Sequence, residues 1–313
     1  MSEIDLIAWF RQRSAIGGQV PLGIGDDCAM IQPSPGAELL VTTDMLMEGR
    51  HFRLGETTPT AVGNKAMAVN LSDIAAMAGI PLAAFVAVAL PRGAAVDIAQ
   101  GLYEGMVPLA ERFGVTLAGG DTNAWDGPLV IGVTLLGETT RRGAVRRSGA
   151  RPGDIIVVTG PLGGSLASGR HLHPQPRISE TLKIHERVPI HAMIDLSDGL
   201  ASDLGHILTE SGGLGACLRA EAIPVHPDAL PSSRASGRTS LDHALRDGED
   251  FELCLTLDPA DWARLVADPI VGVALTSVGT ITAGPGIVIE QGDGSVEPLT
   301  GRGFDHLEQR ATS

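Results

Sequence analysis

The sequence has few aromatic side chains and only three cysteines among its 313 residues. Phe, Trp and Tyr together make up 3% of the chain, so aliphatic residues must supply most of its 43% hydrophobic content. That apolar fraction is enough for a substantial core, in two domains or one large one. Cys28, Cys217 and Cys254 stand singly, without a CxxC pair. This pattern supports neither a zinc ribbon nor a disulfide framework, and it fits a reducing cytoplasm.

Lysine is also scarce, and its positions exclude a large class of enzymes. Lys65 and Lys183 are the only lysines, and neither follows a glycine. The chain therefore has no GK[ST] element, which excludes a P-loop NTPase. It also contains no HRD or DFG triplet, which argues against a protein kinase.

Positive charge and long apolar runs are lacking as well. The net charge of -14 argues against a surface that binds nucleic acid or an anionic membrane. The longest apolar runs, such as residues 82–90, are too short to span a bilayer. The first ten residues carry acids and lack the basic start of a signal peptide. We expect a cytoplasmic protein with no nucleic-acid or membrane partner.

The apolar pattern predicts helices interleaved with strands in both halves, which indicates an α/β or α+β fold class. Helices are expected over residues 3–13, 60–77, 96–113 and 199–211, with a short helix over 262–267. Strands are expected over residues 39–43, 83–90, 116–118, 130–138, 155–159 and 251–257. Residues 171–177 are expected to form an exposed loop, and residues 224–240 to be rich in loops. The turn at residues 151–154 predicts a domain boundary near residue 150, with domains 1–150 and 151–313.

What is present in abundance is carboxylate beside glycine and small hydroxyl residues. GIGDD at residues 23–27 and DLSDG at residues 195–199 are the two densest examples. Asp44, Asp73 and Asp121 are single acids, each beside small residues. Crowded carboxylates repel one another, so either cations lie between them or the groups are in fact apart in the fold. Hard cations such as Mg²⁺ prefer oxygen ligands, usually carboxylates and phosphate oxygens.

Each acidic position also has a structural interpretation. Asp44 could cap a helix from a turn at the end of a strand. Asp73 could be a hydrogen-bonded acid on an otherwise apolar helix, where an unpaired charge is costly. Asp121 follows two glycines, which either form an ordinary turn or let backbone N–H groups approach a phosphate. Ser197 or Asp198 could cap the following helix, although the motif has more polar groups than one cap needs.

The histidines at 171, 173, 185 and 191 could suggest zinc, but they lack the spacing of HExxH. The acidic motifs, taken in their order along the chain, are more informative. They resemble thiamine-monophosphate kinases, in the superfamily that includes aminoimidazole ribonucleotide synthetase. The matching elements are GIGDDCA (23–29), TTD (42–44), KAMAVNLSD (65–73), GGDT (119–122), RSGARPGD (147–154), DLSDGL (195–200), GEDFEL (248–253) and GFDH (303–306).

The resemblance implies a two-domain PurM-like fold. An N-terminal mixed α/β domain would bind ATP and metal and form a homodimer through its strands, and a C-terminal α/β domain would complete the site. The implied reaction passes the γ-phosphoryl group of ATP to thiamine monophosphate, giving thiamine diphosphate and ADP, with several Mg²⁺ ions. The alternatives are another ATP-using enzyme of the superfamily, such as a purine-pathway or selenophosphate synthetase, and a non-catalytic protein that binds divalent metal or nucleotide.

The resemblance also assigns roles by position. The implied magnesium ligands are Asp27, Thr42, Thr43, Asp44, Asp73, Asp121, Asp195 and Asp198. The implied nucleotide contacts are Tyr103, Gly120, Asp121, Arg147 and Ser197, and the implied thiamine-phosphate contacts are His51, Glu249 and Phe304. Among these, Asp44, Asp121, Arg147 and Asp195 would act in the transfer itself.

Overall fold

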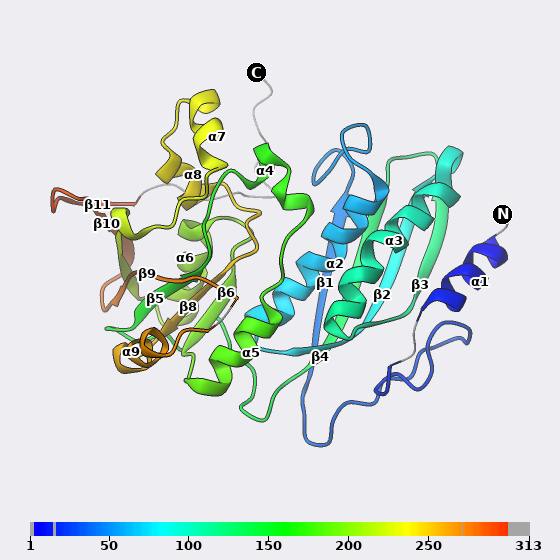
Figure 1. The fold of residues 1–313 in the computed structure, drawn as a ribbon, viewed down its shortest axis with the longest axis horizontal. Helices are drawn as coiled ribbons and strands as arrows, with labels where there is room; N and C mark the ends of the chain where they lie inside the picture. Colours follow the sequence, from blue (N-terminus) through cyan, green and yellow to red (C-terminus); the bar gives the residue numbers. More distant parts are fainter. Residues whose placement is uncertain (1–2, 15–16, 271, 300–313) are drawn as a thin grey trace. The chain divides into compact units, whose positions relative to one another are not determined.

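The computed structural model describes residues 3–14, 17–270 and 272–299 (Figure 1). The chain divides into two compact units. The first comprises Met1–Ala144 with Leu172–Ile178, and the second comprises Val145–His171 with Ser179–Ser313. The expected pair of domains, 1–150 and 151–313, stays a prediction.

The first unit is a four-stranded sheet with helices packed on it. Its elements are α1 (Glu3–Arg13), β1 (Leu39–Met47), α2 (Pro59–Ala76), β2 (Ile80–Pro91), the 3₁₀ helix η1 (Arg92–Ala94), α3 (Ala95–Phe113), β3 (Thr116–Trp125) and β4 (Val130–Glu138). The strand order is β1-β4-β2-β3, in which only β2 and β3 pair in parallel. Helices α2 and α3 pack on each other, and α2 contacts β1, β2 and β4 while α3 contacts β2 and β3 (Figure 1).

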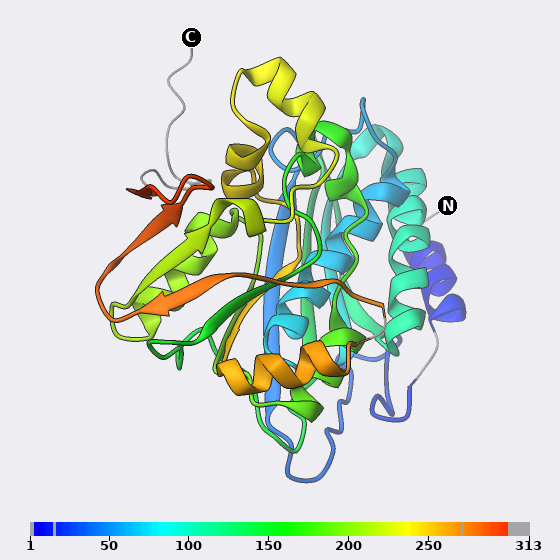
Figure 2. The ribbon, with the colours of Figure 1, turned by 60° about the vertical axis from the view of Figure 1, so that its left-hand side comes forward.

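The later part of the chain forms a larger mixed sheet. Its elements are β5 (Ile155–Thr159), α4 (Ser165–Ser168), η2 (Arg170–Leu172), α5 (Ile178–Arg187), β6 (Ala192–Asp195), α6 (Leu200–Glu210), β7 (Gly215–Arg219), η3 (Ala220–Ala222), α7 (Ala229–Ser236), α8 (Ser240–Arg246), β8 (Leu253–Leu257), α9 (Pro259–Ala267), β9 (Leu275–Thr282), β10 (Gly286–Glu290) and β11 (Val296–Pro298). The seven strands lie in the order β11-β10-β7-β9-β5-β8-β6. Helix α6 packs on this sheet (Figure 2), and Leu204 and Ile207 join Ile156 and Ile194 in the core.

Local sequence accounts for the ends of the main helices. Thr58 accepts a hydrogen bond from the N–H of Ala61 at 3.2 Å, and Pro59 occupies the first position of α2, where its missing N–H costs nothing. Helix α3 ends at Gly114, whose φ of 69° is the left-handed conformation that glycine adopts most readily. None of the helices in the described ranges is both long and apolar enough to cross a membrane.

Several expected boundaries were wrong. Strand β3 does not stop at residue 118 but runs through Gly119, Gly120 and Asp121 to Trp125, so these residues form no turn. Strand β1 likewise continues past Asp44 to Met47, because its last residues keep pairing with β4. Polar residues at a sheet edge can face water, so the apolar pattern alone ends such a strand too early.

Three helices were also missed, and one of them is α8, for which no element was expected. Helix α7 lies in the stretch expected to be rich in loops, and α5 follows the expected loop at residues 171–177. Helix α7 consists largely of small and polar residues, which leave little apolar periodicity to detect.

Candidate active site

A cavity of about 650 Å³ lies in the first unit. Its walls come from α1, the segment 23–29, β2, α3 and β3. The lining includes Asp27, Tyr103, Gly120 and Asp121, which the sequence assigned to metal and nucleotide. Residues from three separate segments therefore meet at one cavity, whose size suits a small-molecule ligand.

Tyr103 belongs to an aromatic cluster at this cavity. Its ring stacks on Phe10 with centroids 5.1 Å apart, and Trp9 meets it edge-on at 5.2 Å. Its hydroxyl group shares a hydrogen bond of 3.0 Å with Oγ of Ser14. Burial raises the pKa of Tyr103 above its ordinary value, so the phenol stays neutral at neutral pH. An apolar aromatic wall of this kind suits a flat purine base.

Gly120 allows β3 to approach β2 closely. A Cβ atom at this position would lie 1.9 Å from the carbonyl oxygen of Val86, so no larger residue fits without a backbone shift. The parallel register also shifts between Ala84 and Phe85, where β2 and β3 meet. Strand β3 then carries Asp121 to the cavity with an exposed side chain, which accepts a hydrogen bond of 3.1 Å from Nδ2 of Asn123.

Strand β1 separates two of the predicted metal ligands. Side chains alternate between the faces of a strand, so Thr42 and Asp44 share one face and Thr43 lies on the other. Thr42 donates a hydrogen bond to Asp73 of α2, whereas Thr43 lies 3.1 Å from the hydroxyl group of Thr134. Asp44 lies inside the strand, so the interpretation as a helix cap is wrong.

His51 lies in a turn that is fixed from two sides. Its Nδ1 atom accepts a hydrogen bond of 3.0 Å from the backbone N–H of Met47. Its carbonyl oxygen accepts one of 3.2 Å from Nζ of Lys65, a fully buried side chain of α2. The ring nitrogen bonded to Met47 carries no proton, because it accepts this hydrogen bond.

In the second unit, the DLSDG motif lies beside an acid that the sequence interpretation missed. The backbone N–H of Asp198 donates to Oδ2 of Asp203 at 3.0 Å. Burial and the neighbouring carboxylates of Asp195 and Asp198 together raise the pKa of Asp203 to about 8, although the hydrogen bond from Asp198 and the charge of Arg147 oppose the shift. The available signal was the position of Asp203 on the buried face of α6, with Leu200 and Leu204.

The same motif does not cap helix α6. The N-cap residue is Gly199, and no side chain makes a capping hydrogen bond. The interpretation in which Ser197 or Asp198 caps this helix is therefore wrong.

Glu249 lies against this motif although about fifty residues separate them. Its backbone N–H donates to the carbonyl oxygen of Ser197 at 2.8 Å. Its carboxylate lies 3.6 Å from Nδ1 of His171, which is largely buried rather than part of an exposed loop. Phe304, which was also predicted to contact thiamine phosphate, lies outside the described residues.

The predicted magnesium ligands are divided between the units. Asp27, Thr42, Thr43, Asp44, Asp73 and Asp121 belong to the first, and Asp195 and Asp198 to the second. Within the described parts of the chain, no three His, Cys, Asp or Glu side chains gather as a metal site.

Residues 25–139 match the family model for AIR synthase related protein, N-terminal domain. The whole chain is similar to the thiamine-monophosphate kinase of Rhodopirellula baltica, with 40% identity over 98% of both chains. The chain belongs to the thiamine-monophosphate kinase family.

Solved structures of this family have the same fold. The thiamine-monophosphate kinase from Stenotrophomonas maltophilia K279a is 34% identical, with a TM-score of 0.78 over 92% of this chain and 95% of that one. AaThiL complexed with AMPPCP and TMP is 31% identical, with a TM-score of 0.76 over 97% and 96%. The mixed α/β, PurM-like fold expected from the resemblance is confirmed.

Membership of this family agrees with the resemblance that the acidic motifs indicated. The roles of individual side chains stay predictions. The structure contributes their local grouping: Asp27, Tyr103, Gly120 and Asp121 at one cavity, and Ser197 beside Glu249.

Proposed function

We propose that this protein transfers the γ-phosphoryl group of ATP to thiamine monophosphate, forming thiamine diphosphate and ADP. The observation that carries the proposal is the 40% identity to a thiamine-monophosphate kinase over 98% of both chains. The complex of AaThiL with TMP and AMPPCP, an ATP analogue, supports the same pair of ligands. The aromatic cavity in the first unit supports a nucleotide site.

The chemistry of this transfer is a problem of charge rather than of nucleophile activation. The acceptor is a phosphate, which is already ionised near neutral pH and needs no strong general base. It is repelled by the phosphates of ATP: two unit charges 4 Å apart cost about 4 kcal/mol at an effective dielectric constant near 20. A barrier increase of about 1.4 kcal/mol slows a reaction tenfold. The protein must therefore supply positive charge and alignment.

Magnesium is the cation that we propose for this role. The carboxylate and hydroxyl oxygens of the predicted ligands are the donors that Mg²⁺ prefers. The donor set in the second unit fits a cation, because Asp195 and Asp198 raise the pKa of a neighbouring acid and so concentrate negative charge at one place. When bound, Mg²⁺ would neutralise phosphate charge.

The side chains of the protein would do the remaining work. Asp195 and Asp198, together with Thr42, Asp44 and the other predicted ligands of the first unit, would hold the cations. Arg147 would add fixed positive charge. We propose direct in-line transfer by positioning and charge neutralisation, without a covalent phosphoenzyme.

A homodimer formed through the first sheet is also proposed. Val41 and Met45 of β1 are 64% and 62% exposed, and Met47 is exposed on the same face. These side chains alternate with the buried Leu40 and Leu46, so one face of the strand is mostly apolar and is exposed within the part of the chain that the structure describes. Apolar faces of this kind commonly form protein interfaces.

We also propose that the reaction takes place in the cytoplasm, where the three cysteines remain free thiols.

A coupled assay of ADP release tests the function. We expect ADP release that requires thiamine monophosphate and yields one thiamine diphosphate for each ADP. Thiamine without its phosphate is the control acceptor and should not support turnover. ADP release that is independent of thiamine monophosphate would contradict the proposal.

A further inference from the structure

The segment that carries Glu249 has an unusual backbone. We call residues 248–251 the GEDF segment. Gly248, Glu249 and Phe251 have φ values of 71°, 57° and 51°. The left-handed conformation is costly for residues other than glycine and persists only where the surroundings enforce it. Two such residues around Asp250 therefore call for a structural support.

Part of that support comes from backbone hydrogen bonds. The N–H groups of Glu249 and Phe251 donate to the carbonyl oxygens of Ser197 and Leu196 at 2.8 and 2.9 Å. The hydroxyl group of Ser165 donates to the carbonyl oxygen of Glu249 at 2.7 Å. The segment is thus fixed against the DLSDG motif on one side and helix α4 on the other.

Asp250 supplies a second support from between the two strained residues. Its side chain is 2% exposed and accepts hydrogen bonds from the N–H of Gly163 at 2.8 Å and from Nη2 of Arg170 at 2.9 Å. Arg170 also donates to the carbonyl oxygen of Gly163 at 3.0 Å and to Asp228 at 3.2 Å. A buried carboxylate needs such partners, so the position of Asp250 depends on Arg170.

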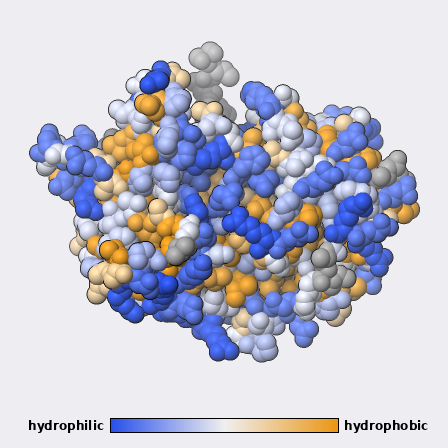
Figure 3. Space-filling view, viewed as in Figure 1, coloured by the Kyte–Doolittle hydropathy of each residue, from blue (hydrophilic) through white to orange (hydrophobic). Residues whose placement is uncertain are grey.

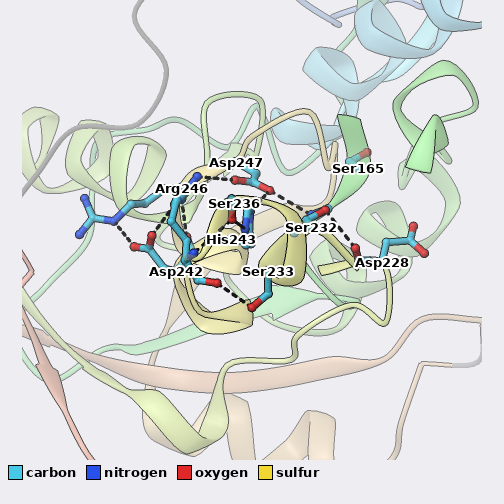
Figure 4. A network of polar contacts seen from close by, with 12 residues as sticks. Ser165, Asp228, Ser232, Ser233, Ser236, Asp242, His243, Arg246 and Asp247 are labelled. Atoms are coloured by element: carbon cyan, nitrogen blue, oxygen red, sulfur yellow. Dashed lines mark hydrogen bonds and ion pairs between the residues drawn. The ribbon is translucent and has the colours of Figure 1, made fainter. Parts of the chain in front are cut away.

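Asp228, the partner of Arg170, and Asp247, the partner of Gly164, are themselves hydrogen-bonded to residues of α7 and α8 (Figure 4). The hydroxyl group of Ser232 donates to the carbonyl oxygen of Asp228 at 3.2 Å. The carboxylate of Asp247 accepts a hydrogen bond of 3.3 Å from the N–H of Gly164 and lies 2.7 Å from Nδ1 of His243. Arg170 therefore donates its hydrogen bond to Asp250 from a position that its other partners hold in place.

We propose that Arg170 is a positioning residue for the substrate: through Asp250 it holds Glu249 in the left-handed conformation that presents its carboxylate to thiamine monophosphate. This rests on the proposed function and on the predicted contact of Glu249 with thiamine phosphate. A carboxylate suits the cationic ring of that substrate, and in this backbone conformation the Glu249 carboxylate lies 3.6 Å from Nδ1 of His171. Arg170 acts through Asp250 and need not touch the substrate.

The test compares Arg170→Ala and Arg170→Lys with Arg187→Ala. Arg187 is the matched control, because it is also an arginine paired with an aspartate, donating to the carbonyl oxygen and the carboxylate of Asp268, but lies on the surface at the end of α5. Steady-state kinetics are measured with thiamine monophosphate varied at saturating ATP and the reverse. Hydrogen exchange of a peptide covering residues 247–253 is measured on the same samples.

We expect Arg170→Ala to raise the KM for thiamine monophosphate about tenfold, equivalent to about 1.4 kcal/mol of binding energy, and to change the KM for ATP less than about twofold. Arg170→Lys should recover part of this loss, because lysine keeps the charge but cannot make the same forked contacts. Exchange in residues 247–253 should accelerate in both variants and stay unchanged in Arg187→Ala.

Equal changes in both KM values, or unchanged exchange in Arg170→Ala, would overturn the inference. If the unaltered protein shows no turnover of thiamine monophosphate, the proposed function fails instead. The exchange measurement then still decides whether Arg170 holds the segment.

Discussion

At the scale of single residues, the carboxylates of Asp44 and Asp250 lie in two different surroundings. Asp44 shares a face of β1 with Thr42, which is hydrogen-bonded to Asp73, so three oxygen-bearing side chains are directed to one side of the strand. Asp250 is buried and held by Arg170. We propose that the first binds a cation and that the second supports the conformation of its neighbours.

Replacing Asp44 by Asn removes a charge and keeps the shape. We expect turnover to fall by at least about 100-fold at saturating Mg²⁺, because lost charge stabilisation in an active site has effects of this size. The thermal midpoint should change little. The ADP-release assay checks the first expectation, with Asp126→Asn, an exposed acid paired with Arg92, as control. Near-normal activity of Asp44→Asn would show that Asp44 is not a required ligand.

Asp250 should make stability depend on pH. Burial raises its pKa to about 6 from an ordinary 3.8, although hydrogen bonds from Gly163 and Arg170 oppose the shift. The native state then holds this proton more tightly than the unfolded chain. The stability that Asp250 contributes through this proton is fully present below pH 4 and is lost as the pH rises through 6.

As the pH rises from 4 to 7, the free energy of unfolding should therefore fall less in Asp250→Asn than in the unaltered protein. The difference should be up to about 3 kcal/mol for a shift of about two pKa units. Urea unfolding of both proteins across this range measures the difference. Parallel profiles would show that Asp250 does not titrate in this window.

At the scale of elements, strand β3 does two things at once. It pairs with β2 so closely that Gly120 has no room for a side chain, and it delivers Asp121 to the cavity. Both depend on the strand continuing through the two glycines, where a turn was expected from the sequence.

Gly120→Ala should be strongly destabilising. Its Cβ would lie 1.9 Å from the carbonyl oxygen of Val86, and backbone cannot yield as a flexible side chain does. Overpacking of this kind costs about 1–3 kcal/mol or more. Urea unfolding measures the loss. Gly132→Ala in β4 is the matched control, because its nearest neighbours would be 3.9 Å away. Equal stability of the two variants would refute the steric argument.

At the scale of the whole molecule, the two units have separate sheets. Figure 3 shows one face on which hydrophilic residues surround smaller apolar patches. The apolar residues of β1 stand out because they are regular: Val41, Met45 and Met47 follow the period of a strand and are exposed.

Met45→Glu should convert the proposed dimer into a monomer, since a charge at a buried contact is costly to desolvate. Size-exclusion chromatography with light scattering measures the mass. Val266→Glu on α9, where the side chain is 56% exposed, serves as control and should leave the mass unchanged. A monomeric unaltered protein would rule out the proposed interface.

The sequence by itself determined the features that depend on neighbours along the chain. The helix at residues 3–13 and the strands at 130–138 and 155–159 were predicted with the observed bounds, because their patterns are regular and clearly bounded. The order of the acidic motifs also indicated the family. These patterns can be recognised in the sequence without knowledge of any distant contact.

Only the tertiary structure decided which distant residues meet. It placed Glu249 beside Ser197, Thr42 beside Asp73 and Asp250 beside Arg170. These outcomes follow from strand pairing and helix packing between segments far apart in the chain, which local periodicity does not encode.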